Sequence, residues 1–397
     1  MSSHQHHLPQ LPQEVIDAVV DHVAANNDES LLPLLQSHSR FGQSVRRHLY
    51  RDVIVHLEAN GPRIELDSDA RLFFQQLMPN AKANHSIHPS VVKKVTVYLA
   101  IDNERTSVAW DQLTRGFSLL PHLDTVRLDF VEGEDLDDGL IAGLVSFIPQ
   151  NVKKLQFQTL TFTPPAFVRL LSHYPALHTV ETVYCESLDD ISAASGVHAL
   201  PAQTLVIHNM DTQLEWDVDS PILRDAFDNV RALRVTRTDE EDLANMLEMY
   251  PDICELQCEI STEDWEDGVP LEVGRLRLMG IDVRQSLQHL VGVLRRSENV
   301  AWQHVVVHVD IAESQHVSGE NALPDLADAL GQHGVHSLCV ADRGRATSSD
   351  AAVCQKMIME SMRGKKKVVG SVKVISTPDP HMPMNYGVEK YFQYSSD

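Results

Sequence analysis

The histidines of this 397-residue chain are the residues best suited to bind a metal, and their spacing argues against a metal site. His4, His6 and His7 lie near the N-terminus with no cysteine or carboxylate close by, so we expect a solvated tail. His304 and His308 are four residues apart, which on the strand expected there is roughly 13 Å, too far for one ion. We therefore predict no bound metal.

The cysteines and the known catalytic motifs indicate a protein without enzymatic chemistry. Five scattered cysteines, an odd number, are typical of reduced thiols inside the cell, and an extended strand separates Cys254 from Cys258 too widely for a disulfide. The chain has no P-loop, His-Glu-x-x-His, Gly-x-Ser-x-Gly or Cys-x-x-Cys motif. A triad assembled from distant residues stays open, because triads are defined by geometry. We expect no catalysis and no cofactor.

The charge of the chain restricts its partners. With 33 Lys+Arg and 56 Asp+Glu the net charge is −23, which argues against nucleic acid or an anionic membrane as a general partner. The longest apolar run, 140–149, is about half of a membrane span, and the first residues lack the apolar core of a secretory signal. We predict a cytoplasmic and/or nuclear protein.

The first elements expected along the chain are three short helices within residues 11–55, after a polar tail at 1–10. Pro12 suits a first helical turn, and five apolar residues follow it at helical spacing: Val15, Ile16, Val19, Val20 and Val23. Asp28 can cap a second helix, and a third carries apolar residues every four positions. The apolar residues of these two helices are Leu31, Leu32, Leu34, Leu35, Phe41, Val45 and Leu49. Such a small unit usually needs a partner to cover its apolar surface.

A strand pattern, apolar-x-x-apolar-x-apolar, recurs after residue 91 at intervals of about 28 residues and alternates with helical spacing. The eleven copies begin at Val92, Leu123, Val152, Leu177, Ala202, Val230, Ile253, Val273, Trp302, Val335 and Val369. This arrangement predicts an α/β solenoid over residues 91–377, preceded by a linker or first helical connection at 56–90 and followed by a tail at 378–397. A doubly wound α/β domain is the alternative. The shared internal spacing and the absence of glycine-rich turns favour the solenoid.

The fourth and sixth places of each copy are expected to point into the core, because strand side chains alternate between the two faces. Five leucines at the fourth place test this register: Leu155, Leu205, Leu233, Leu276 and Leu338.

Two stretches of the chain resemble known families. The first resembles the F-box of fungal F-box-like proteins and includes Leu11-Pro12-x-Glu14-Val15-Ile16-Asp17, Val20-Asp21-His22-Val23, Ser39-Arg40-Phe41 and Arg46-x-x-Leu49-Tyr50-Arg51-x-Val53. The repeats are similar to leucine-rich repeats in the first six places of their pattern. They depart at the ninth place, where Asn is replaced by Ala100, Leu160, Met210, Thr238 or Ile281, so we expect no regular asparagine ladder.

Together the resemblances imply an α+β protein, in which a short all-α F-box is followed by a leucine-rich-repeat-like solenoid. They imply a substrate receptor in an SCF (cullin–RING) ubiquitin ligase, which binds a Skp-type adaptor, and through it a cullin, as well as a target protein. The positions implied for adaptor binding are Leu11, Pro12, Ile16, Leu34 and Leu35. We expect four of them, Leu11, Pro12, Ile16 and Leu35, to form a patch that is exposed in the free chain. The alternative is an interaction scaffold unrelated to ubiquitin, whose N-terminal helices only cap the solenoid.

The third, fifth and seventh places of the copies are expected on the open, concave face of the sheet. They hold seven Lys or Arg and only four acids, although the whole chain is acidic. This reversal predicts that an acidic or phosphorylated segment of the target binds there. The residues expected to contact it are Arg234, Arg275, Arg277, His304 and His308. Alternatively, these long side chains only cover apolar sheet surface.

Overall fold

The computed structural model describes most of the chain up to residue 260 and isolated segments after it. The described residues are 12–26, 31, 33–34, 41–60, 63–78, 88–99, 107–188, 198–209, 216–217, 219–238, 240–260, 278–282, 304–309, 328–329, 337–342, 356 and 371–376. The chain divides into two compact units, described in turn below: 1–160 with 170–177, and 161–169 with 178–397.

The first unit begins with a small group of helices, as expected from the sequence. Helix α1 (Gln13–Asn26) and helix α3 (Gly42–Leu49) enclose a core of Val20, Leu31 and Val45, each at most 1% exposed. Four partly buried residues pack against this core: Val23, Leu34, Phe41 and Leu49. The described residues of the second predicted helix, 31 and 33–34, are helical.

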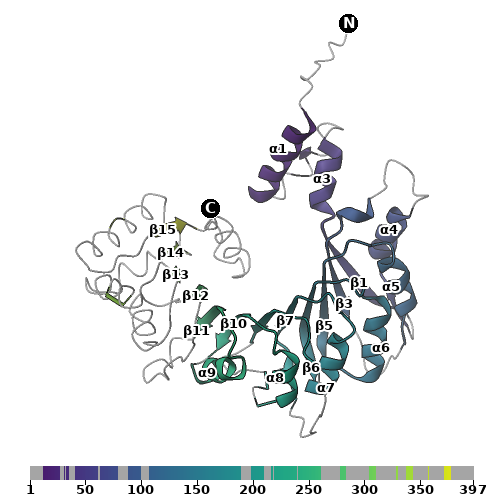
Figure 1. The fold of residues 1–397 in the computed structure, drawn as a ribbon. Coiled ribbons are helices and arrows are strands. Elements are labelled where there is room, and N and C mark those ends of the chain that lie inside the picture. The colour runs from purple at the N-terminus through teal and green to yellow at the C-terminus, as the bar shows by residue number, and fades with distance from the viewer. Residues whose placement is uncertain are drawn as a thin grey trace. The chain divides into compact units, whose positions relative to one another are not determined.

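A mixed α/β layer follows in the same unit (Figure 1). Its strands are β1 (Asp52–Asn60), β2 (Arg63–Leu66), β3 (Lys94–Leu99), β4 (Ser107–Val108), β5 (Thr125–Asp135) and the first residues of β6 (Lys154–Phe162), in the order β4-β2-β1-β3-β5-β6. Strands β1, β3 and β5 are parallel, and β2 is antiparallel to β1. The helices are α4 (Ser68–Leu77), η3 (Pro89–Val91), α5 (Trp110–Phe117) and α6 (Asp138–Phe147).

The second unit repeats the parallel βα arrangement. Its helices are α7 (Pro164–Leu171), which begins in this unit, α8 (Pro221–Ala226) and α9 (Glu240–Met249). Its strands run in the order β7-β9-β10-β11-β12-β13-β14-β15, and β8 (Glu186–Ser187) pairs with the end of β6. Their bounds are β7 Thr179–Val183, β9 Thr204–His208, β10 Ala232–Thr238, β11 Glu255–Ile260, β12 Leu278–Asp282, β13 His304–Val309, β14 Ser337–Asp342 and β15 Ser371–Ser376. No described helix combines the length and the apolar character needed to cross a membrane.

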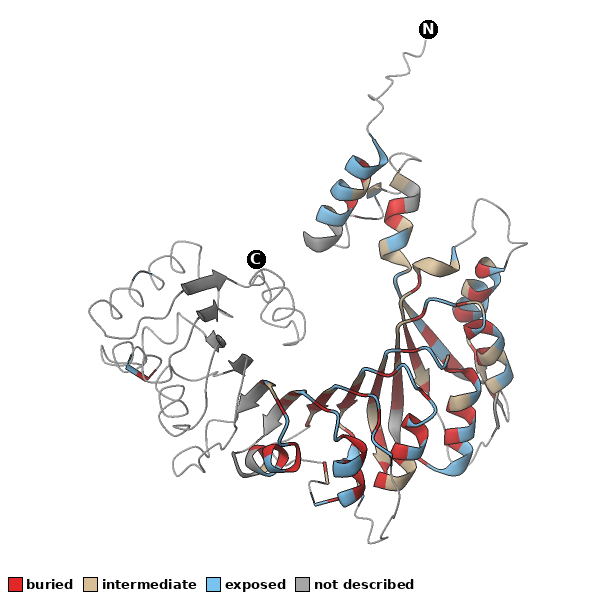
Figure 2. Cartoon of the chain, in the orientation of Figure 1, coloured by how far each residue is buried: buried red, intermediate tan, exposed pale blue. Residues whose placement is uncertain are grey.

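The predicted strand register is confirmed where side chains are described. Leu155, Leu205 and Leu233 are fully buried, and buried residues line the strands and the helix sides that face them (Figure 2). Leu338 lies on β14 in register with Val305, as the pattern requires. The weaker copy at Leu177 is also in register, because Val180 pairs with Leu205.

One copy of the pattern was assigned the wrong register. Leu278, expected at the sixth place, pairs with Glu255 at the third place, so Met279 and Ile281 align with Leu256 and Cys258. The strand is therefore displaced by three residues from the prediction. Leu276 precedes β12 and lies outside the described residues.

A further copy of the pattern was missed because it lies within the expected F-box and linker. Strand β1 pairs with β3 through Val53 and Val55, which occupy the fourth and sixth places of a copy starting at Tyr50. The segment expected as a linker or first helical connection (56–90) contains the end of β1 and strand β2 as well as helix α4.

The starts of six strands, β3, β5, β6, β9, β10 and β11, are each held by a shared backbone carbonyl. The N–H groups at the second and third places both donate to the second-place carbonyl of the preceding strand: those of Lys93 and Lys94 to Arg51, those of Asp124 and Thr125 to Lys93, and those of Lys153 and Lys154 to Asp124. The same arrangement recurs in the second unit, for example from Cys254 and Glu255 to Arg231. These bonds satisfy the backbone N–H groups at the starts of these strands, and no asparagine side chain is needed for it.

Helices α4, α5 and α6 pack through aromatic rings that lie over glycines. A Cβ atom on Gly116 would lie 2.6 Å from Phe74 Cζ, and one on Gly143 would lie 2.3 Å from Trp110 Cε2. The Trp110 ring also stacks on Phe147, with 5.8 Å between the ring centroids and 9° between the planes. Only glycine lets the ring of the preceding helix approach this closely.

Candidate functional site

The two faces of α1 differ sharply in exposure. Ile16 and Val20 are at most 3% exposed, whereas Val15 and Val19 are 42% and 43% exposed. Residues 16, 20 and 23 share one helix face, from which Val20 and Val23 contribute to the core, and residues 19 and 15 lie about 60° and 100° around the helix from residue 16. Pro12 is exposed as well. We call Pro12, Val15 and Val19 the outer face of α1.

The predicted adaptor-binding residues are thus placed differently from one another. Pro12 is exposed as expected, but Ile16 is buried, which corrects the expectation of an exposed side chain, and Leu34 is partly buried against the helical core. Leu11 and Leu35 lie outside the described residues. The exposed residues that were not singled out, Val15 and Val19, carry a signal in the sequence, since they are four residues apart on one helix.

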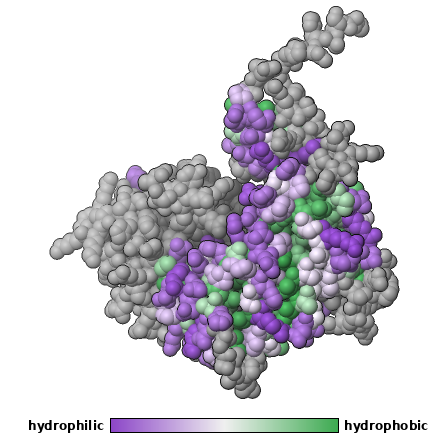
Figure 3. Space-filling model, turned by 45° about the vertical axis from the view of Figure 1, so that its right-hand side comes forward, coloured by the Kyte–Doolittle hydropathy of each residue, from purple (hydrophilic) through white to green (hydrophobic). Residues whose placement is uncertain are grey.

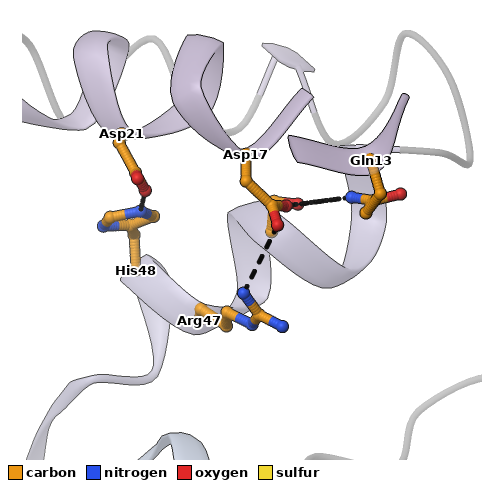
Figure 4. Close-up of polar contacts among 6 residues, drawn as sticks. Gln13, Asp17, Asp21, Arg47 and His48 are labelled. Atoms are coloured by element: carbon orange, nitrogen blue, oxygen red, sulfur yellow. Dashed lines mark hydrogen bonds and ion pairs between the residues drawn. The ribbon is translucent and has the colours of Figure 1, made fainter. Parts of the chain in front are cut away.

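Polar contacts on one flank hold α1 against α3 (Figure 4). The carboxylate of Asp17 accepts hydrogen bonds from Gln13 Nε2 at 2.9 Å and from the Ser44 hydroxyl, and it lies 3.6 Å from the Arg47 guanidinium. One turn later, His48 Nε2 lies 2.7 Å from Asp21 Oδ1. The hydrogen bonds from Ser44 and Gln13, and then the charge of Arg47, lower the pKa of Asp17. The flank orients α1 so that its outer face stays exposed.

The surface of this helical unit is otherwise hydrophilic. On the face shown in Figure 3, hydrophilic residues cover most of the described part of the N-terminal helices, with a few hydrophobic residues among them. Exposed valines in such surroundings are candidates for contact with another protein.

Three of the five predicted target-binding residues lie on described strands, at places that share the open face of the sheet, the face away from the helices. Arg234 occupies the fifth place of its copy on β10, and His304 and His308 occupy the third and seventh places on β13, in agreement with the prediction. Arg275 and Arg277 precede β12, which begins three residues later in the pattern than predicted, and both lie outside the described residues. Their assignment to the third and fifth places was wrong.

This displacement removes the predicted charge reversal. In the corrected register, β12 contributes Leu278, Gly280 and Asp282 to the three places. The eleven predicted copies then carry five basic and five acidic residues at those places. The argument for an acidic ligand on the open face of the C-terminal half therefore fails.

Several of the described polar residues on the open face contact one another. In the first unit, Arg127 donates to Gln158 and lies 3.3 Å from the Asp129 carboxylate. Burial raises the pKa of Asp129, although Arg127 opposes this effect. His56 stacks on Tyr98 with ring centroids 4.7 Å apart. These contacts form a polar protein surface, and within the described ranges no three His, Cys, Asp or Glu residues are placed to hold a metal ion.

Comparison with known proteins adds no family to this description. The chain matches no protein-family model, and no curated protein matches it significantly.

Proposed function

We propose that the chain is the substrate-recruiting F-box subunit of an SCF (cullin–RING) ubiquitin ligase. In this proposal the N-terminal helices bind a Skp-type adaptor, and through it a cullin, and the strand–helix repeats form a leucine-rich-repeat-like solenoid that binds a target protein. The observation that carries it is the outer face of α1, where two valines stay more than 40% exposed on a helix whose adjacent face packs on its own core.

The outer face has the properties of a docking helix. Its apolar residues, at positions 12, 15 and 19, form one stripe along the first two turns of α1. Full burial of a valine side chain is worth roughly 1.5–3 kcal/mol, so covering the two half-exposed valines would contribute a useful part of that to association. The motif in the sequence selects the adaptor as the partner, since the stripe begins at its Leu11-Pro12 pair.

The repeats support the second half of the proposal. Successive strands keep one register over many copies, and each copy contacts its neighbours through the same pairs of places. Proteins built in this way present long surfaces for binding other proteins.

The test is binding of the full chain to a purified Skp-type adaptor. The double variant Val15→Asp with Val19→Asp should lose binding, while its free energy of unfolding should change by less than about 1 kcal/mol, because both side chains are exposed. The matched control is Leu72→Asp on α4, which also replaces a half-exposed apolar residue (52%) and should bind normally.

Two results would refute the proposal. If the unaltered chain does not bind the adaptor, the scaffold alternative is favoured. If the double variant unfolds or binds as well as the unaltered chain, the outer face of α1 is not the docking surface.

A further inference from the structure

The shared-carbonyl contacts bring basic residues together at the entry edge of the first unit's sheet. The second and third places of three successive strands hold Arg51 and Asp52, Lys93 and Lys94, and Asp124 and Thr125, and the next strand holds Lys153 and Lys154. Neighbouring strands are about 4.8 Å apart, so the four strand starts span roughly 14 Å. We call Arg51, Lys93, Lys94, Lys153 and Lys154 the basic edge.

The basic edge keeps a net positive charge after its acids are counted. Asp124 lies between two lysines, 3.1 Å from Lys153 Nζ and 3.8 Å from Lys93 Nζ. One carboxylate is thus shared by two ammonium groups, and Asp52 is the other acid at these places. Five basic residues and two acids leave a charge of +3 on this edge, in a chain whose net charge is −23.

Three cations of this edge, Arg51, Lys93 and Lys153, reach solvent, whereas Lys94 and Lys154 are half-buried. The side chains of Lys93 and Lys153 are 43% and 66% exposed, and Arg51 is exposed. Positive side chains on neighbouring strands attract a peptide chain whose negative side chains are spaced at a similar distance. In an extended peptide, alternate residues are about 7 Å apart. A segment of a few residues therefore spans the roughly 14 Å of the basic edge.

We infer that the basic edge binds an acidic, extended segment of a partner protein. Nucleic acid carries a continuous phosphate charge that the rest of this strongly acidic chain repels, whereas a short acidic peptide needs only the local field. The inference rests on the proposed function in one respect, because under that function the acidic segment belongs to the target protein.

The probe is a fluorescein-labelled 12-residue peptide of alternating Glu and Ser, whose binding to the full chain is measured by fluorescence polarisation at 50 and 200 mM NaCl. Binding should weaken with salt. Lys93→Gln with Lys153→Gln should weaken it by roughly two- to thirtyfold, since each exposed ion pair contributes a factor of about 1.4 to 5. Asp124→Asn should strengthen peptide binding by a factor of about 1.4 to 5, the contribution of one exposed ion pair.

Matched controls separate this inference from general charge effects and from the proposed function. Arg71→Gln with Arg115→Gln also removes two exposed charges from the first unit, on helices α4 and α5 and not at the strand starts, and should leave peptide binding unchanged. Adaptor binding should be the same in all these variants. The inference is overturned if the peptide does not bind, if Asp124→Asn weakens binding, or if a 12-nucleotide single-stranded DNA displaces the peptide at equal concentration.

Discussion

Replacing Gly143 with alanine tests the packing between α5 and α6. Alanine is the better helix former by about 1 kcal/mol, so helix propensity alone predicts a more stable protein. The structure predicts the opposite. The added Cβ would lie 2.3 Å from Trp110 Cε2 and 2.6 Å from Cζ2, closer than any real carbon contact, and the ring cannot simply turn away because it stacks on Phe147.

The expected magnitude follows from these two opposing effects. Overpacking a well-filled core costs about 1–3 kcal/mol, and the gain in helix propensity offsets about 1 kcal/mol of this. Gly143→Ala should therefore lower the free energy of unfolding by up to about 2 kcal/mol. Urea denaturation measures this change, followed by the fluorescence of the chain's four tryptophans, to which Trp110 contributes.

The same substitution at Gly139 is the matched control, because it lies on α6 but is exposed and its Cβ would meet only Asp137 Oδ1 at 3.3 Å. Gly139→Ala should raise stability by up to about 1 kcal/mol. In a Trp110→Ala background, Gly143→Ala should no longer destabilise. A Gly143→Ala protein as stable as the unaltered chain, with unchanged fluorescence, would show that the ring does not occupy the space over this glycine.

Two further predictions concern the N-terminal helices. Ile16→Ala should cost about 2–5 kcal/mol in unfolding free energy because Ile16 is buried, whereas Val15→Ala, on the outer face, should cost much less; equal costs would contradict the two-faced α1. Because its pKa is lowered on folding, Asp17 stabilises the helical unit at neutral pH, and this contribution is lost as the pH falls below about 4. The melting temperatures of Asp17→Asn and the unaltered chain should therefore differ at pH 6 and converge at pH 2–3, and a constant difference would refute this.

The strand places that point into the core were readable in the sequence. A strand with one face under helices must place apolar residues at every second position, so Leu155, Leu205 and Leu233 identify their own register. The small helical core was readable for the same reason, since Val20 and Val45 recur at helical spacing within their segments.

The register of β12 was not readable, because its sequence satisfies the pattern twice. Leu276 with Leu278, and Met279 with Ile281, both place apolar residues two apart. Only pairing with β11 and β13 distinguishes these alternatives, because backbone hydrogen bonds depend on the neighbouring strands and not on the side chains of one strand.

The exposure of α1 was also decided by tertiary structure. Val15, Ile16, Val19 and Val20 are similar in chemistry, and the sequence places all of them on a broad apolar helix face. The position of α3 and the polar flank from Asp17 to Ser44 determine which of them are covered. Burial depends on what packs against a helix, so the same side chain is core on one side of α1 and a candidate docking surface a quarter-turn away.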